Sequence, residues 1–148
     1  MAEKIKVGVA GVGDFGRHHV RLYRELEGAD LVGIYDADAA RARTIAQEFG
    51  TSAFDSLAAL SETAQAVSVA VPTKHHAAVG MELLRRGCDV LVEKPIAASL
   101  TEADELIRTA EAGQRILQVG HTERFNPAVV AAAKVVTQPL FLDRKSVV

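Results

Sequence analysis

Three glycines near the N-terminus are spaced as Gly-x-Gly-x-x-Gly, at positions 11, 13 and 16. They follow an alternating apolar run at residues 5–9 that is typical of a buried strand, and they precede a helical pattern that starts near Phe15. Gly11 permits a tight strand-to-helix turn, Gly13 lets a pyrophosphate approach the backbone, and Gly16 lets the helix pack closely on the sheet. Free N–H groups at the start of that helix attract an anion. The motif therefore predicts a dinucleotide site at this turn.

An acidic residue follows the second expected strand at the distance that such a site requires. The apolar run at residues 31–35 ends at Asp36, 20 residues after Gly16. An acid at this place accepts hydrogen bonds from the adenosine ribose and repels a 2′-phosphate. Two arginines, Arg41 and Arg43, lie further along the chain. We expect NAD to bind in preference to NADP; the alternative is a structural glycine turn beside an unrelated surface aspartate.

Composition and charge narrow the class of protein. The chain has 148 residues, 49% hydrophobic side chains and a net charge of −2, which predicts one globular domain without electrostatic attraction to nucleic acid or to an anionic membrane. The apolar runs have the length of strands rather than membrane spans, and the N-terminus lacks the pattern of a signal peptide. The only cysteine, Cys88, suits a reducing compartment and is interpreted as a small packed residue. We expect a cytoplasmic protein.

Strand and helix patterns alternate along the chain with short turns between them. Strands are predicted at residues 5–9, 31–35, 52–54, 66–71, 89–92 and 116–119. Helices are predicted at residues 15–27, 38–49, 57–60, 73–86, 101–113 and 127–136. This alternation indicates the α/β class, with a doubly wound parallel sheet (a Rossmann fold) of about six strands and helices on both faces.

Local signals predict the helix ends and one buried helix face. The residues expected to begin helices have a side chain that accepts a hydrogen bond from a free N–H group: Asp38, Thr73, Thr101 with Asp104 as a capping box, and Asn126 before Pro127. Gly50, Gly87 and Gly113 are expected to end helices. The inward stripe of the first helix is predicted to consist of Phe15, His19, Leu22 and Leu26.

In a sheet of this kind, ligands bind beyond the carboxyl ends of the strands. Polar residues gather at three such ends, at residues 71–76, 93–95 and 120–125. A lysine beside a bound nicotinamide, here Lys94, can hydrogen-bond a substrate hydroxyl and stabilise developing alkoxide charge. The alternative is a solvated lysine paired with Glu93. No cluster has the spacing of metal ligands, and no Ser–His–Asp arrangement is indicated.

Three segments together resemble one known family. They are Gly-Val-Gly-Asp-Phe-Gly at 11–16, Val-Pro-Thr-Lys-His-His at 71–76 and Glu-Lys-Pro at 93–95. In this combination the chain resembles, over essentially its whole length, the glucose–fructose oxidoreductase, inositol dehydrogenase and rhizopine catabolism (Gfo/Idh/MocA) family. The resemblance implies an NAD- or NADP-dependent oxidoreductase that acts on a sugar, cyclitol or nucleotide sugar. The stretch at 120–127 is similar to members that act on UDP-N-acetylglucosamine-type substrates.

The resemblance also implies roles for individual residues. Lys94 is the catalytic lysine at the reacting hydroxyl, and Glu93 lies near the nicotinamide ribose. His76 matches the family's spacing from the preceding proline, while His121 and Arg124 are the expected substrate contacts. The residues expected to bind the cofactor are Gly11, Val12, Gly13, Asp14, Phe15, Gly16, Asp36, Ala37, Val71, Pro72, Thr73, His76, Glu93 and Lys94.

Family members usually carry a second α/β domain that holds the substrate and supplies an acid/base pair. We expect residues 1–138 to form the cofactor domain, and residues 139–148 to be a stub of the second domain or an altered tail. Self-association is expected through residues 140–142, and the parent protein is expected to be a homo-oligomer. The chain alone is expected to bind the cofactor and to turn over little.

Two other classes of protein share the glycine-rich first turn. A stand-alone NAD-sensing module would share the glycines and Asp36, but it has no use for Glu-Lys-Pro at 93–95. A class I methyltransferase usually has an acid just before the glycines, where this chain has Val9 and Ala10. The dehydrogenase domain is therefore the favoured hypothesis.

Overall fold

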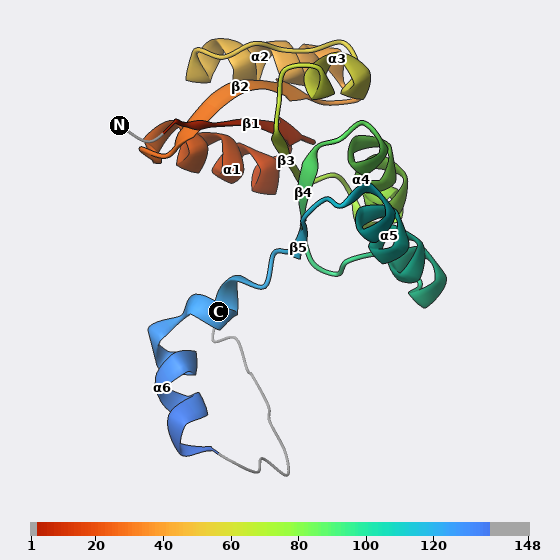
Figure 1. Cartoon of the computed structure of the whole chain (residues 1–148). Coiled ribbons are helices and arrows are strands. Elements are labelled where there is room, and N and C mark those ends of the chain that lie inside the picture. Colours follow the sequence, from red (N-terminus) through yellow and green to blue (C-terminus); the bar gives the residue numbers. More distant parts are fainter. Residues whose placement is uncertain (1–2, 137–148) are drawn as a thin grey trace.

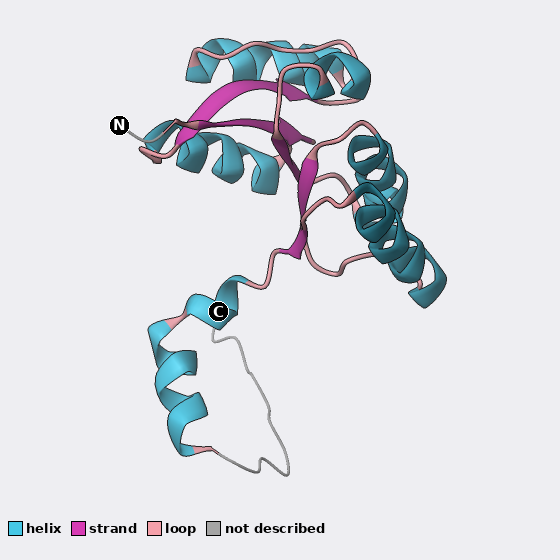
Figure 2. Cartoon of the chain, in the orientation of Figure 1, coloured by secondary structure: helices cyan, strands magenta, loops and turns pink. Residues whose placement is uncertain are grey.

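The chain folds around one parallel sheet, which Figures 1 and 2 show edge-on with helices on both sides. The structure is a computed structural model that describes residues 3–136. Its strands are β1 (Ile5–Ala10), β2 (Ala29–Tyr35), β3 (Ala66–Val69), β4 (Asp89–Val92) and β5 (Leu117–Val119). They pair in the order β2-β1-β3-β4-β5, and every pairing is parallel. The predicted fold class is confirmed.

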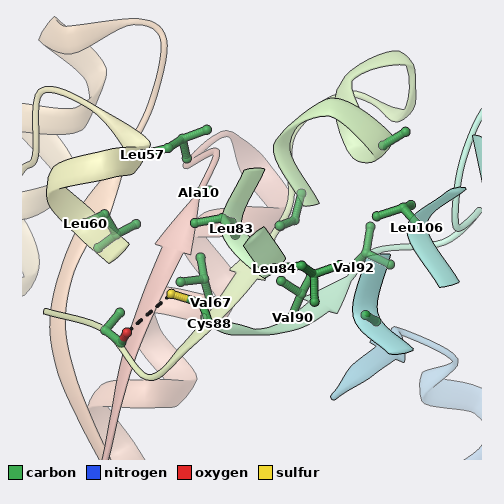
Figure 3. Close-up of a cluster of buried hydrophobic side chains, with 14 of the residues drawn as sticks. Ala10, Leu57, Leu60, Val67, Leu83, Leu84, Cys88, Val90, Val92 and Leu106 are labelled. Carbon is green, nitrogen blue, oxygen red and sulfur yellow. Dashed lines mark hydrogen bonds between the residues drawn. The ribbon is translucent and has the colours of Figure 1, made fainter. Parts of the chain in front are cut away.

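Helices connect the strands and enclose two apolar cores. They are α1 (Asp14–Glu25), α2 (Ala39–Phe49), α3 (Leu57–Ser61), α4 (His76–Arg85), α5 (Leu100–Gly113) and α6 (Pro127–Val135), with short 3₁₀ turns η1 (Thr73–His75) and η2 (Thr122–Phe125). The larger core lies between α3–α5 and the sheet, and Figure 3 shows Leu60, Leu83, Val90 and Leu106 within it. The smaller core joins α1 and α2 to β1 and β2. Coverage of the sheet on both faces explains why β3 is apolar except for the buried Ser68.

The prediction of the buried face of α1 was wrong for three of its four residues. Phe15, Leu22 and Leu26 are 63%, 47% and 54% exposed, and only His19 faces the sheet. The buried positions are instead Gly16 and Val20. Gly16 faces inward because the first turn of α1 lies against the backbone of the glycine turn, where a Cβ would come within 1.8 Å of the Gly11 carbonyl oxygen. Val20 packs into the smaller core.

The expected strand at residues 52–54 is a single bridge between Ala53 and Ile34, so the sheet has five strands rather than about six. Only two backbone hydrogen bonds form there: Ile34 donates to Ser52, and Phe54 donates to Ile34. Ser56 then caps α3 and turns the chain away from the sheet edge. β3 is also shorter than expected and ends at Val69.

Two predicted helix caps are confirmed and two were wrong. Asp38 accepts hydrogen bonds from the N–H groups at the start of α2, and Asn126 does the same for α6. Thr73 makes no capping hydrogen bond and begins η1 instead. The cap of α5 is Ser99, whose hydroxyl accepts from the Glu102 N–H, because the chain is already helical at position 101.

The helix ends also differ in part from the prediction. Gly50 ends α2 in the left-handed conformation, as expected. Gly113 is the last residue of α5, but the left-handed residue after it is Gln114, with φ of 51°. Gly87 has φ of 87° and lies just beyond the last turn of α4.

Cys88 is packed in the larger core, as predicted, with 1% of its surface exposed. Its Sγ donates to the Ala64 carbonyl at 3.4 Å, the dashed line in Figure 3. Burial raises the pKa of the thiol above its ordinary value, which lowers its reactivity.

Within residues 3–136, no helix is long and apolar enough to cross a membrane, and no group of three His, Cys, Asp or Glu side chains could hold a metal ion. The tail at 139–148 and the apolar segment at 140–142 lie outside the described residues.

Candidate cofactor-binding and active site

The glycine turn between β1 and α1 is too tight for side chains at two positions. Gly11 has φ of +86°, and a Cβ there would come within 2.7 Å of the Val71 nitrogen. A Cβ on Gly16 would lie 1.8 Å from the Gly11 carbonyl oxygen. Gly11 also donates its N–H to the Tyr35 carbonyl, at 2.7 Å. The first turn of α1 therefore rests directly on the strand-to-helix connection, with its free N–H groups at the carboxyl edge of the sheet.

Gly13, the N-cap of α1, faces open space. A Cβ built there meets no atom nearer than Arg41 Nη1, at 3.8 Å. The space is a cavity of about 520 Å³ at the ends of β1, β2 and β3. It is lined by Gly11, Gly13, Asp14, Phe15, Tyr35, Asp36, Ala37, Arg41, Leu57, Ala70, Val71, Pro72, His75, Ala78 and Val79. A side chain at position 13 would enter this cavity without disturbing the core.

Asp36 is held at one end of the cavity by the backbone. Its Oδ2 accepts from the Val12 N–H and its Oδ1 from the Asp38 N–H, both at 2.8 Å. Each carboxylate oxygen keeps a further lone pair for a ligand hydroxyl. The side chain is only 9% exposed, so its position is well defined. Sequence and structure thus agree in placing this acid beside the glycine turn.

Arg41 lies across the entrance beside Asp36. Its guanidinium is 3.8 Å from Asp36 Oδ2 and 3.2 Å from Asp38 Oδ2. The backbone N–H of Arg41, together with its guanidinium, holds the pKa of the exposed Asp38 below its usual range. Arg41 therefore offsets part of the negative charge that would oppose a 2′-phosphate. Arg43 does not line the cavity.

Lys94 stands at the opposite end, in a smaller recess of about 210 Å³. The recess is lined by Phe15, Ala70, Val71, Pro72, Thr73, His76, Glu93 and Lys94. Four of these residues, Phe15, Ala70, Val71 and Pro72, also line the larger cavity, so the two spaces adjoin. Lys94 Nζ lies 5.9 Å from the centre of the Phe15 ring. The glycine turn, Asp36 and Lys94 therefore border one continuous trough.

Two other predicted cofactor contacts are largely occupied by the protein itself. Glu93 Oε1 lies 3.0 Å from His19 Nε2, and its Oε2 accepts the Lys94 N–H at 3.2 Å. His76 is 1% exposed, and its ring nitrogens face the carbonyl oxygens of Val71 and Pro95. Both residues border the recess beside Lys94, with their polar atoms bound within the protein.

His121 and Arg124 lie in a different recess from Lys94. Both are exposed and line a space of about 310 Å³ beside β5, together with Phe125. Sequence reasoning placed all three strand ends at one edge, which is correct, but it gave no information about how far apart the side chains lie.

The trough suits a dinucleotide in its shape and in its chemistry. The N-terminus of α1 carries a positive partial charge that attracts an anion. Gly13, the N-cap, has no side chain and lets a pyrophosphate approach the backbone there. Asp36 offers acceptors at one end, and Phe15, Val71 and Pro72 provide apolar walls toward the other. These are the features that a dinucleotide-binding site at this turn requires.

Comparison with known proteins agrees with this geometry. The family described as an oxidoreductase family with an NAD-binding Rossmann fold, Gfo/Idh/MocA, matches residues 5–121. The chain belongs to this family. Its NAD-binding domain is therefore the part described here, and the family assignment favours a dehydrogenase over the methyltransferase and sensor alternatives.

Relatives of this domain include dehydrogenases of cyclitols and nucleotide sugars. The UDP-N-acetylglucosamine 3-dehydrogenase of Acidithiobacillus ferrooxidans is 38% identical over 125 residues, which are 84% of this chain and 39% of that protein. An inositol 2-dehydrogenase of Rubrobacter xylanophilus is 35% identical, over 91% of this chain and 40% of that protein. The chain thus spans about two fifths of the length of these relatives.

Solved structures show the same fold. A crystal form of the Acidithiobacillus ferrooxidans enzyme has a TM-score of 0.85 at 36% identity, covering 91% of this chain and 44% of that one. GenD2 from gentamicin A biosynthesis, solved in complex with NAD, has a TM-score of 0.87 at 27% identity, covering 93% and 40%.

Sequence reasoning missed several residues of the trough. Tyr35, Leu57, Ala78 and Val79 line the larger cavity but belong to no motif. The positions of Ala78 and Val79, in the first turn of α4 at a strand end, could have indicated them. His19 could not have been found as a partner of Glu93, because 74 residues separate them.

A valine at Gly13 should abolish NADH binding and leave the fold intact. The nearest atom to the Cβ is Arg41 Nη1 at 3.8 Å, so the branched side chain would fit and would fill the cavity where the pyrophosphate contacts the helix start. Titration followed by nicotinamide fluorescence, with circular dichroism of the same sample, measures both effects. The matched control is Gly28→Val, because a Cβ at Gly28 meets nothing within 4 Å and Gly28 lies outside the trough. Unchanged NADH affinity in Gly13→Val would place the phosphates elsewhere.

Replacing Asp36 by alanine should reduce the preference for NADH over NADPH. The wild-type chain should bind NADH more tightly, because the Asp36 carboxylate accepts from the ribose and repels a 2′-phosphate. Without it, Arg41 remains beside the site as a cation. The ratio of the two dissociation constants is the measurement, and equal or tighter NADPH binding by the wild type would contradict the assignment.

Proposed function

We propose that this domain serves an NAD-dependent dehydrogenase that transfers a hydride between the nicotinamide and a hydroxyl-bearing carbon of a sugar, cyclitol or nucleotide sugar. The observation that carries the proposal is Lys94 at one end of the trough that begins at Asp36 and passes Gly13. A binding module needs the glycine turn and the acid. It does not need a cation at the nicotinamide end.

The bound nicotinamide ring supplies the hydride acceptor or donor. The chain's own part begins at α1, whose N-terminal N–H groups hold the pyrophosphate, while Asp36 holds the adenosine ribose. Lys94 then donates a hydrogen bond to the substrate oxygen and stabilises negative charge as it develops there. Phe15, Val71 and Pro72 line the junction of the two spaces with apolar surface and limit the access of water.

The remaining predicted contacts fall into two groups. Thr73, His76 and Glu93 border the recess and shape it around the nicotinamide half of the cofactor. His121 and Arg124 present polar groups beside β5, where a substrate that extends beyond the reacting carbon would be contacted. Their exposure in the described part of the chain fits a surface that another part of the protein covers when substrate binds.

The activities of the relatives, rather than a substrate pocket in the described residues, support the proposed substrate class. Their printed activities concern UDP-N-acetylglucosamine and inositol, both of which present secondary hydroxyl groups. Because this chain spans about two fifths of their length, the proposed activity requires a further substrate-binding region. The net charge of −2 and the buried single cysteine favour a cytoplasmic protein that does not bind nucleic acid.

In the longer polypeptide that combines this domain with such a region, Lys94→Ala should lower kcat by about 10²–10⁴-fold, the usual contribution of general acid–base groups. The NADH dissociation constant should change much less, because Lys94 acts on the substrate oxygen rather than on the pyrophosphate. Steady-state kinetics and NADH titration together test this. Loss of NADH binding with retained turnover at saturating cofactor would show that Lys94 is a cofactor or structural residue.

The 148-residue chain alone should bind NADH but show negligible turnover of UDP-N-acetylglucosamine, inositol or glucose. Positioning of the reacting hydroxyl against the nicotinamide contributes roughly 7–11 kcal/mol to lowering the barrier. In the described residues, the expected substrate contacts His121 and Arg124 line a different recess from Lys94. An absorbance assay at saturating NAD decides the point. Turnover at roughly 1–10³ s⁻¹ would show that this domain already holds a complete active site.

A further inference from the structure

The turn that carries Lys94 is held by two histidines from opposite sides of the sheet. This lysine turn, residues 93–95, follows β4 directly. His19 reaches it from α1, and His76 reaches it from the start of α4. α1 packs against the smaller core and α4 against the larger one. Both histidine side chains are largely buried, so their ring nitrogens contact the protein rather than solvent.

The alternation of β4 explains the first contact. Leu91 pairs with Ser68, whose hydroxyl lies 2.7 Å from the Tyr23 hydroxyl on α1, so this face of the strand points toward α1. Glu93, two residues after Leu91, points the same way. On α1, His19 precedes Tyr23 by one helical turn and therefore lies on the same stripe. The sheet and the helix thus bring Glu93 and His19 together.

One carboxylate connects His19 to the backbone of Lys94. Glu93 Oε1 lies 3.0 Å from His19 Nε2, and Oε2 accepts the Lys94 N–H at 3.2 Å. The side chains of His19 and Glu93 are only 17% and 15% exposed. Gly120 packs against the Glu93 carboxylate so closely that a Cβ at position 120 would come within 3.0 Å of Oε1. The carboxylate has little freedom to leave this position.

His76 fixes the end of the lysine turn. Its Nδ1 lies 2.8 Å from the Pro95 carbonyl oxygen and its Nε2 lies 2.9 Å from the Val71 carbonyl oxygen. Carbonyl oxygens only accept, so a neutral ring donates to one of them and a doubly protonated ring donates to both. In either state the ring stands between the lysine turn and the β3 connection that lines the trough.

We propose that His19 and His76 are positioning residues that fix the lysine turn relative to the bound cofactor; this inference rests on the proposed role of Lys94. The long lysine side chain loses rotamer freedom when it is placed at a reacting atom, so its backbone must already be fixed. α1 carries the phosphate-facing Gly13 at its start and His19 about 9 Å further along its axis, at 1.5 Å per residue. The rigid helix therefore sets the distance between the phosphate site and the lysine turn.

The first test measures hydrogen exchange of the Lys94 amide by NMR in the 148-residue chain. His19→Leu removes the donor to Glu93, so the carboxylate is free to move away from the Lys94 N–H. Loss of that charge-assisted hydrogen bond should raise the exchange rate of the Lys94 amide about tenfold. His19→Gln places an amide nitrogen near the position of Nε2 and should restore slow exchange. The control is His18→Leu, because His18 is exposed on the same helix and lines neither space of the trough.

Equal Lys94 exchange in His19→Leu and His18→Leu would overturn the proposal for His19. Thermal denaturation of each variant identifies loss of the fold, and Glu93→Leu provides a second route if His19→Leu does not fold. A leucine at 93 has no acceptor for either contact, so the Lys94 amide should again exchange faster. Slow exchange in Glu93→Leu would equally contradict the proposed link.

The second test separates the two contacts of His76 in the longer polypeptide. His76→Asn places an amide nitrogen near Nδ1 and can keep the Pro95 contact, whereas His76→Gln places one near Nε2 and can keep only the Val71 contact. If the lysine turn is what matters, His76→Asn should keep most of kcat, and His76→Gln should lower kcat at least tenfold with the NADH dissociation constant changed less than about twofold. Equal kcat in the two variants would contradict a positioning role for His76.

These outcomes are distinguishable from failure of the proposed function. If Lys94→Ala leaves kcat unchanged, the catalytic role of Lys94 fails, and the exchange data still report whether the histidines hold its turn. If Lys94→Ala lowers kcat but the histidine variants change neither exchange nor kcat, the positioning inference alone is overturned.

Discussion

The contact between the first turn of α1 and the end of β1 sets the geometry of the whole carboxyl edge of the sheet. A Cβ on Gly16 would lie 1.8 Å from the Gly11 carbonyl oxygen, so only glycine allows the helix to start where it does. From that start, α1 presents its N–H groups to the trough and His19 to the lysine turn. Asp36 is tied to the same turn through the Val12 N–H. Gly13, Asp36 and the turn that carries Lys94 are thereby all positioned relative to one helix.

Much of the fold could be predicted because its determinants are local. The parallel sheet follows from apolar runs separated by helical patterns, and Asp38, Gly50 and Asn126 act as caps because capping depends on the residue and its immediate neighbours. The buried face of α1 could not be predicted by the size of its apolar residues. Close approach to the turn requires a glycine at position 16 on the inward face, and Phe15 beside it lies at the edge of the trough.

Only the residues of the site that belong to sequence motifs could be predicted. Gly13 and Asp36 have fixed places in the first βαβ unit, so the sequence located them correctly at the trough. The polar contacts of Glu93 and His76 depend on helices from different layers and are visible only once the fold brings them together. The separation of His121 from Lys94 likewise depends on where β5 ends at the sheet edge. Spacing along the chain carries no information on any of these distances.

The orientation of NAD in the trough is the central claim, because the roles of Gly13, Asp36 and Lys94 all depend on it. Intermolecular nuclear Overhauser effects between NAD and the isotopically labelled chain test it most directly. We predict contacts from the nicotinamide protons to the Phe15 ring and the Lys94 side chain, and from the adenosine ribose protons to Ala37, next to Asp36. Adenine contacts at Phe15 and Lys94, or contacts confined to surfaces outside the trough, would contradict the account.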